Sequence, residues 1–400
     1  MAERIPALDI ARGVAILGTL ATNIWIFSHP EGMFGYLNSP VTADLPAWQG
    51  WLEKVLQQLA NGKFLGLLTL MFGIGLAIQA DAAARRGLRW PGSYLWRALL
   101  LFLDGLLNYL LVFDVLMGYA VTGAIVAYLL ATSPRSQRVW FTVTAGVHIA
   151  LILFITAGLL SGQARLGSGE PLQPNPYRDG SWWDLVVLRW QNPGLFRFEP
   201  VLILAGSIAL FLAGAWLHRN GVFGAHGRVL RRRLMLIGAV ALGADLGLGL
   251  ADPDWMPLTR WVVSPVVAAG LLALIVELVG SREPGWAGRR LAEVGRVALS
   301  AYIVQNIIAS ILFHGWGFDL GAFGSPWRTA VSISGWVAIC ALVVLGAHLW
   351  LRRFRRGPVE WLWNRGYEAL SRSDRGRTAA HPSGVAGWAA EARPFRSSCT

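Results

Sequence analysis

The stretch Leu8–Asn23, LDIARGVAILGTLATN, is apolar enough for a membrane-spanning helix, yet it contains Asp9, Arg12 and Asn23. In an α-helix Asp9 and Arg12 lie about 60° apart, and Asn23 returns to within about 20° of Arg12, roughly 16 Å further along the axis. Ionisable side chains in a bilayer usually face the protein interior or a wet cavity. This face of the helix is therefore a candidate functional site, and the fold is interpreted outward from it.

The whole chain has the composition of a membrane protein. Of its 400 residues, 54% are hydrophobic and 14% are charged, whereas a soluble domain has about 25% charged residues. Apolar runs bounded by arginines recur along the chain, which predicts an all-α, polytopic transmembrane bundle of about ten spans. No small-residue cleavage site follows the first run, so we expect no cleavable signal peptide. The expected spans are 8–27, 63–80, 95–113, 116–132, 139–160, 199–217, 234–251, 261–280, 297–313 and 329–351.

Positive charge is distributed unevenly between alternate loops. The net charge is +12, and 27 of the 35 basic residues fall on the side that carries both chain ends. By the positive-inside rule, we expect both termini in the cytoplasm and the protein in the plasma membrane, as a multi-pass protein. The arginines flank spans, which favours contact with the lipid bilayer and not with nucleic acid.

We predict a single transmembrane domain over residues 1–366, with two long outward loops. The first loop, about 28–62, contains PAWQGWLEKVLQQLANGK, a predicted amphipathic helix on the membrane surface. The second loop, about 161–198, has room for one surface helix near 181–191. Residues 367–400 are predicted to form a disordered cytoplasmic tail, because Gly, Ala, Arg, Pro and Ser dominate them from Ser373 onward.

A second polar face occurs in the expected span 95–113. Arg97, Asp104 and Asn108 share one side of this helix, and Asp114 and Tyr119 follow at its outward end. This face is expected to meet the polar face of the first helix across a cavity. The alternative is that Arg97 is an interfacial residue and Asp104 a structural partner.

A third group lies in the expected span 297–313. Tyr302, Gln305 and Asn306 fall within it, Arg296 marks its cytoplasmic end, and His314 marks its outward end. Side-chain amides in spans either line cavities or form hydrogen bonds between helices, and both interpretations remain open here.

His29, just beyond the first span, has an ordinary pKa suited to proton transfer near neutral pH. Other chemistries lack their motifs. The chain has no phosphate-binding Gly-Lys-Ser/Thr loop, no HExxH motif, no Cys/His cluster and no Gly-x-Ser-x-Gly elbow. We therefore expect no ATP hydrolysis, no metal site and no tightly bound cofactor.

The opening LDIARGVAILGTLATNI closely resembles the start of the YeiB-like family, known as domain of unknown function number 418. Three later stretches match in order: LFLDGLLNYLLVFDVLMGYAVTG, GRVALSAYIVQNIIASILFHGWGFDLGAFG and RRGPVEWLWNR. The resemblance extends to about residue 366, and the half from about 218 corresponds to the second conserved part of the family.

The Leu-Asp-x-x-Arg-Gly opening is also similar to the first helix of transmembrane acyltransferases, such as the lysosomal heparan glucosaminide acetyltransferase and bacterial sugar O-acyltransferases. That resemblance implies acyl transfer from cytoplasmic acyl-CoA, as a co-substrate, to a hydroxyl or amine on the far side. It implies that Asp9 and Arg12 lie where the donor enters, and that Asn23 lies near the reacting centre. Members of the YeiB-like family commonly carry histidine at the position of Asn108. Because asparagine cannot act as a general base, this resemblance implies a base from elsewhere, with His29 or Asp114 as the candidates.

The first hypothesis is therefore a membrane acyltransferase, and the alternatives are a proton-coupled transporter or a non-catalytic scaffold. The assigned residues fall into three groups. The catalytic candidates are His29, Asn23, Asn108 and Asp114; the donor-binding candidates are Asp9, Arg12, Arg97 and Arg296; and the cavity-lining candidates are Asp104, Tyr119, Tyr302, Gln305, Asn306 and His314.

Overall fold

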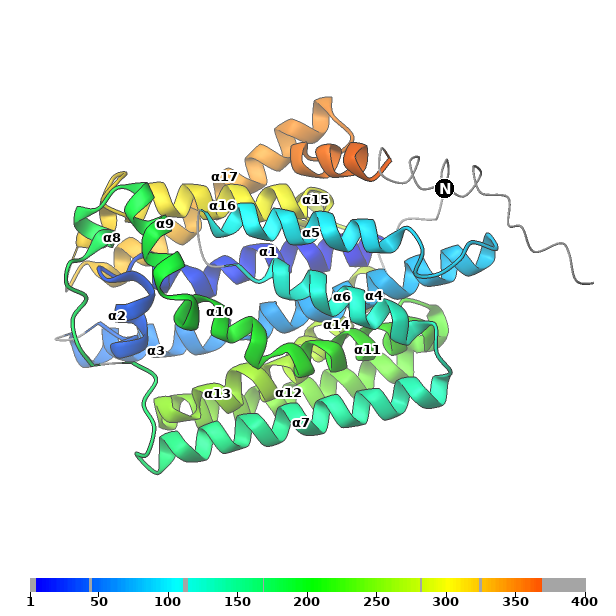
Figure 1. The fold of residues 1–400 in the computed structure, drawn as a ribbon, viewed down its shortest axis with the longest axis horizontal. Coiled ribbons are helices and arrows are strands. Elements are labelled where there is room, and N and C mark those ends of the chain that lie inside the picture. The colour runs from blue at the N-terminus through cyan, green and yellow to red at the C-terminus, as the bar shows by residue number, and fades with distance from the viewer. Residues whose placement is uncertain are drawn as a thin grey trace, which may run out of the picture.

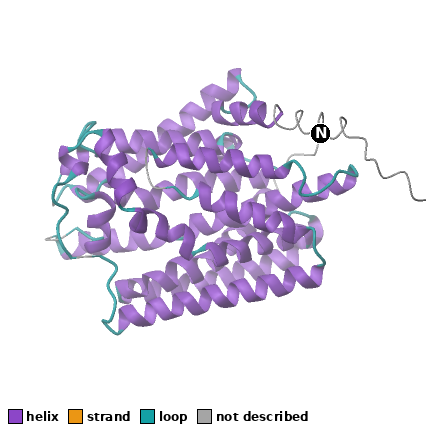
Figure 2. Cartoon of the chain, viewed as in Figure 1, coloured by secondary structure: helices purple, strands orange, loops and turns teal. Residues whose placement is uncertain are grey.

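The computed structural model describes residues 5–42, 45–110, 114–167, 169–280, 283–323 and 326–368. Every regular element in these ranges is a helix, which confirms the all-α prediction (Figures 1 and 2). Most long helices run roughly along one common axis. We call the two ends of this bundle the Arg12 end, where the first helix begins, and the His29 end, where it finishes.

Helix α1 (Pro6–Phe27) lies at the centre of the bundle. It packs against α4 (Lys63–Arg85), α14 (Ser264–Gly280), α15 (Trp286–Arg296) and α16 (Ala298–Phe313). No residue from 7 to 29 is exposed. A side chain at Gly13 would lie 2.1 Å from the Leu291 carbonyl oxygen, so the absence of one allows α1 and α15 to approach closely.

A second group of helices flanks this centre. α11 (Leu204–Arg219) packs against α4 and against α7 (Pro134–Leu160), and α12 (Arg228–Ala251) packs against α14. Much of the apolar surface of α7 and α12 is uncovered by protein, as expected for lipid-facing helices. Gly73 allows α4 and α11 to approach closely, because a Cβ there would lie 2.1 Å from the Phe211 carbonyl oxygen.

Within the described part of the chain, seven helical segments are long and apolar enough to cross a membrane. The number is eight when the pair α15 and α16, bent by 89°, is counted as one span. The predicted count of ten is not confirmed. The difference comes from α5 (Tyr94–Tyr109) and α6 (Leu116–Leu130), which have 16 and 15 residues. Helices of this length reach about 24 Å, short of the roughly 30 Å of a hydrocarbon core.

The short hairpin of α5 and α6 packs against a later segment of the chain. This segment contains α8 (Pro176–Asp179), α9 (Trp182–Gln191) and α10 (Pro193–Leu202). Arg189 of α9 donates hydrogen bonds to the carbonyls of Tyr109, at 2.9 Å, and Leu110, at 2.7 Å. These are carbonyls at the end of α5 that have no helical partner. The helix predicted near 181–191 is confirmed as α9, and its segment forms part of the packed bundle at the His29 end.

The helix predicted from PAWQGWLEKVLQQLANGK is confirmed as α3 (Ala47–Ala60), but its orientation differs from the prediction. Its polar face, with Gln49, Glu53, Gln57 and Gln58, is buried, whereas Trp48 is 69% exposed. α3 continues into α4 after a break at Asn61–Gly62, and together they form one 39-residue span. The apolar face therefore points toward lipid and the polar face toward the protein interior.

Helix α17 (Arg328–Arg353) runs from the His29 end to the Arg12 end (Figure 1), and residues 358–368 follow as a further helix. Both the start of α1 and residues 358–368 lie at the Arg12 end, although the cytoplasmic location of the termini stays a prediction. The predicted disordered tail lies outside the described residues from 369 onward. The remaining elements are α2 (Gly32–Asn38), η1 (Ala225–Gly227), η2 (Pro253–Trp255), α13 (Met256–Leu258), the π-helical η3 (Thr259–Val263) and η4 (Leu320–Ala322).

Candidate functional site

Three interrupted helices meet at Arg260, toward the His29 end of the bundle. Arg260 lies in the π-helical turn η3, a type of distortion that often occurs at functional sites. Its guanidinium donates to Asn61 Oδ1 at 2.6 Å, at the break between α3 and α4. It also donates to Glu199 Oε1 at 2.8 and 3.0 Å, just before the break between α10 and α11. Irregular backbone at this depth is tolerated where protein or a polar cavity satisfies it.

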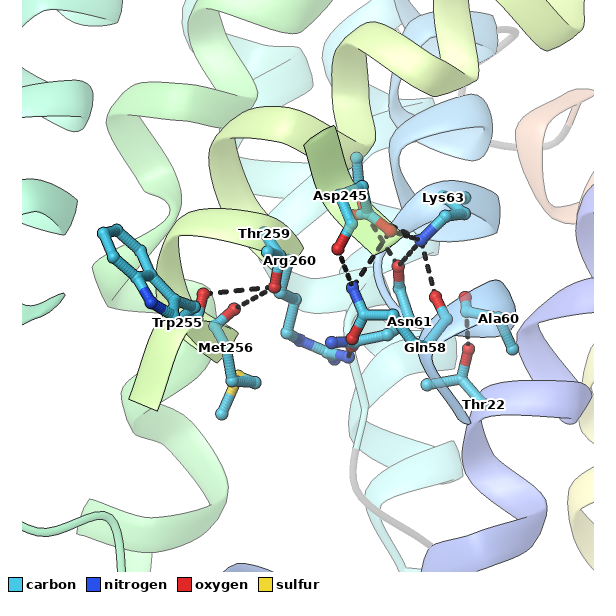
Figure 3. A network of polar contacts seen from close by, with 11 residues as sticks. Thr22, Gln58, Ala60, Asn61, Lys63, Asp245, Trp255, Met256, Thr259 and Arg260 are labelled. Carbon is cyan, nitrogen blue, oxygen red and sulfur yellow. Dashed lines mark hydrogen bonds and ion pairs between the residues drawn. The ribbon is translucent and has the colours of Figure 1, made fainter. Parts of the chain in front are cut away.

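Beside Arg260 lies a sealed ion pair between Lys63 and Asp245 (Figure 3). Lys63 Nζ lies 2.5 Å from Asp245 Oδ2, and Asp245 is 0% exposed. The same carboxylate accepts from Gln58 Nε2 at 2.9 Å and from Ser264 Oγ at 3.0 Å. Lys63 also donates to the carbonyls of Gln58 and Asn61. This cluster is fully paired, which is the arrangement that makes a buried ion pair tolerable.

The polar face of α1 remains partly open. Arg12 and Asp9 form an ion pair at 3.3 Å, with 34% and 17% of their side-chain surfaces exposed. The Arg12 guanidinium lies opposite Gly75 of α4, where a Cβ would be 3.9 Å from it. Asn23, toward the other end of α1, is half-buried and its carboxamide hydrogen-bonds to no described residue. Arg12 and Asp9 near the start of α1, and Asn23 toward its other end, therefore keep part of their side-chain surface uncovered by protein.

The structure brings Arg97 close to Arg12 around one turn of α4. Arg97 Nη1 donates to Gln79 Oε1 at 2.6 Å, and Gln79 Nε2 donates back to the Gly75 carbonyl. The Arg97 guanidinium also stacks on the Tyr367 ring, 4.3 Å from its centroid. Arg97 is therefore neither free in solvent nor paired with Asp104.

The other two candidates at the Arg12 end have different surroundings. Arg296 ends α15, and its Nε is buried without a hydrogen-bond partner among the described residues. Asp104 lies near Trp363 and Glu360 of the helix 358–368, which covers this side of α5. Asp104 Oδ2 is buried without a hydrogen-bond partner among the described residues, so the role of Asp104 stays a prediction.

Polar groups gather near the end of α5. Asn108 Nδ2 donates to Asp114 Oδ1 at 3.2 Å, and Asp114 Oδ2 accepts the Met117 N–H at 3.0 Å, which caps the start of α6. The Tyr302 hydroxyl of α16 lies near Asn108 and Asn306, and neither atom of the Asn306 carboxamide has a hydrogen-bond partner among the described residues. The polar end of α5 therefore lies near α16, whereas the sequence analysis expected the polar face of this span to meet that of α1.

Two neighbours of this group differ in their pairing. Gln305 is 0% exposed, and neither atom of its carboxamide has a hydrogen-bond partner among the described residues. Tyr119, in contrast, shares a 2.7 Å hydrogen bond with Thr69 of α4. Buried amides without partners are costly, so Gln305 marks a place where water or a ligand is expected.

Both candidate histidines lie near a small pocket of about 130 Å³ at the His29 end, which His29 and Tyr177 help to line. His29 Nδ1 accepts the Glu31 N–H at 3.1 Å, and its ring also donates to the Ser39 carbonyl. Burial and the charge of Arg328 lower the pKa of His29 to about 3. This ring is neutral at physiological pH, and both of its nitrogens already hold the α1–α2 connection in place.

His314 is packed more tightly. Its Nδ1 lies 3.0 Å from Ser310 Oγ, and its ring contacts Tyr177 and Phe27. Burial and, to a smaller extent, Arg189 lower the pKa of His314 to about 3. These contacts describe a packing residue and not a cavity-lining one.

Several polar residues that the sequence analysis did not select lie at the His29 end. By the expected span boundaries, Tyr36 and Glu53 fall within the first outward loop. The other four, Lys63, Glu199, Arg260 and Arg328, lie at a span end or one residue before it. The structure places them inside the bundle: Tyr36, Glu53, Lys63, Glu199, Arg260 and Arg328. The polar face of α3 was the one available signal, since its glutamine and glutamate spacing is helical.

The apolar helices and the buried charges define a polytopic helical membrane protein. Residues 217–368 match the family model described as "Protein of unknown function (DUF418)". The "uncharacterized protein YxaH" of Bacillus subtilis (strain 168) is 27% identical over 396 residues, covering 90% of this chain and 93% of the relative. The "uncharacterized protein YeiB" of Escherichia coli (strain K12) is 29% identical over 389 residues, covering 90% and 95%. By these matches the chain is similar to proteins of the YeiB-like DUF418 family over nearly its whole length. No solved structure matches it.

Proposed function

We propose that this protein is an integral membrane acyltransferase. It would take an acyl group from acyl-CoA at the Arg12 end and transfer it to a hydroxyl or amine acceptor at the His29 end. The observation that carries this proposal is the partly open polar face of α1. Arg12 stands at one end of this face and the unpaired Asn23 toward the other, on a helix enclosed by its neighbours.

Donor binding is assigned to the arginines at the Arg12 end. Arg12, Arg97 and Arg296 offer guanidinium groups to the phosphates of coenzyme A, and charge-assisted hydrogen bonds of this kind are strong. Arg12 retains uncovered surface, and Arg296 has a buried nitrogen without a partner. Gln79 and Tyr367 hold Arg97 in place beside them.

In the transfer, the acceptor oxygen or nitrogen attacks the thioester carbonyl, the acyl–sulfur bond breaks, and the thiol leaves with the proton that the acceptor loses. The amide N–H groups of Asn23 and Gln305 are suited to stabilising the oxyanion, because neither is already used within the protein. Both predicted bases already accept hydrogen bonds: Asp114 from Asn108 and Met117, and His29 from Glu31. Proton uptake by either would require the release of such a bond.

A specific observation favours the second candidate, a proton-coupled transporter. The Lys63–Asp245 pair lies at the junction of interrupted helices, and such ionisable pairs mark proton pathways in transporters. The scaffold alternative is less well supported, because it requires a fully paired Arg12, and a third of this side chain is uncovered.

Calorimetric titration of acetyl-CoA into the purified full-length protein tests the proposal. The wild type is expected to bind, and Arg12→Ala is expected to weaken binding at least about tenfold, since it removes charge-assisted hydrogen bonds. Arg135→Ala is the matched control, because Arg135 is exposed at the start of α7 at the same end of the bundle. Absent binding in the wild type, or equal binding by Arg12→Ala, would contradict the proposal.

A further inference from the structure

Arg328, the first residue of α17, is a buried cation, and two of its three side-chain nitrogens have no hydrogen-bond partner among the described residues. It is 4% exposed, and its Nε and Nη2 atoms have no acceptor among the described residues. A buried charge left in this state costs several kcal/mol by general estimates, so bound water or a ligand is expected to satisfy it. Nε and Nη2 form the side of the guanidinium that binds a carboxylate or phosphate through two parallel hydrogen bonds.

The carboxylate of Glu53, a described residue within electrostatic range of Arg328, is already used by other donors. Glu53 of α3 lies within electrostatic range of Arg328 but forms no ion pair with it at 4.0 Å or less. Its Oε1 accepts from the hydroxyls of Thr329, at 2.6 Å, and Thr42, at 2.9 Å. Its Oε2 accepts the Thr42 N–H at 2.8 Å. The negative charge of Glu53 thus balances part of the charge of Arg328, but Glu53 does not accept hydrogen bonds from the Nε and Nη2 atoms of Arg328.

A second donor faces the same region. The Tyr36 hydroxyl of α2 lies within electrostatic range of both Arg328 and Arg260 and hydrogen-bonds to no described residue. Burial raises the pKa of Tyr36 above its ordinary value, so the hydroxyl keeps its proton and can donate it to an acceptor. The His29 ring also lies within electrostatic range of Arg328 and is neutral.

We propose that Arg328 and Tyr36, with Arg260 nearby, form a binding site for the anionic group of a small molecule, either a carboxylate or a phosphate. The anion accepts two hydrogen bonds from Arg328 and one from Tyr36. The site is distinct from the donor-binding arginines, which lie at the opposite end of α1. That this anion belongs to the acyl acceptor rests on the proposed function, whereas the existence of the site does not.

The test is calorimetric titration of inorganic phosphate and of acetate into the full-length protein in detergent. Arg328→Lys keeps the positive charge but removes the two parallel N–H donors of the guanidinium. We therefore expect anion binding about ten- to a hundredfold weaker than in the wild type. Arg328→Gln should abolish it, and Tyr36→Phe should weaken it about tenfold. Arg165→Gln, which alters an exposed arginine at the same end, should leave this binding unchanged.

A second arm separates a free anion from a lipid headgroup. The titration is repeated in nanodiscs of phosphatidylcholine with and without phosphatidylglycerol. Because Arg328 is enclosed by protein, the expected result is the same anion affinity in both, and competition by phosphatidylglycerol would overturn the assignment to a small molecule. Wild-type affinity in Arg328→Gln, or no anion binding in the wild type, would overturn the site itself. Arg328 variants that still bind acetyl-CoA while losing phosphate binding leave the proposed function standing independently.

Discussion

Lys63 and Arg328 are both buried cations at the His29 end, yet their surroundings are opposite. Lys63 donates to a carboxylate and to two carbonyls, and its partner Asp245 receives two further hydrogen bonds. Arg328 has two buried nitrogens with no partner among the described residues, and the oxygens of Glu53, which lies within electrostatic range, accept hydrogen bonds from threonines. Burial alone therefore does not separate structural charges from functional ones, whereas the state of their hydrogen bonds does.

The strongest test of the paired region removes one partner. Asp245→Ala leaves Lys63 buried and uncompensated, which is expected to cost about 3–5 kcal/mol of stability. Thermal unfolding followed by tryptophan fluorescence measures the effect. If the single variant does not accumulate, the double variant Lys63→Met with Asp245→Leu is expected to recover most of the stability, because two apolar residues replace the pair. If Asp245→Ala is as stable as the wild type, the Lys63–Asp245 pair does not contribute to the stability of the fold.

A smaller effect distinguishes two buried glutamines. Gln58→Leu removes hydrogen bonds to Asp245 and is expected to cost about 1–3 kcal/mol. Gln305→Leu removes an amide without partners, so stability should stay unchanged or rise by up to about 1 kcal/mol. The two unfolding midpoints are compared in the same detergent. An equal loss in both variants would mean that Gln305 is paired in the folded protein.

The sequence allowed α1, its ion pair and the all-α bundle to be predicted, because hydropathy and helical spacing are local properties. It did not reveal that α5 and α6 stop short, since apolar composition continues past Tyr109 while the helix does not. The orientation of α3 was also missed. An amphipathic helix is expected to turn its polar face to water, but here Glu53 and Gln58 face buried partners in a protein interior more polar than its lipid surroundings.

The polar partners were harder still to predict. Asp245 and Lys63 are 182 positions apart, and Arg260 and Glu199 are 61 apart, so only the fold brings them together. Arg12 and Asp9 were predictable as a pair because they lie three positions apart on one helix. The candidate site at Arg328 depends on which acceptors are absent from its surroundings, which no local pattern in the sequence encodes.

The central claim is that the polar face of α1 borders space reached by water. Introducing Asn23→Cys into a chain whose Cys340 and Cys399 are replaced by alanine, and measuring its reaction with a small water-soluble thiosulfonate, tests this directly. Leu20→Cys is the control, because Leu20 is 0% exposed on the same helix. The account predicts that Asn23→Cys is modified while Leu20→Cys is not. An Asn23→Cys protein that reacts no faster than Leu20→Cys would contradict the claim.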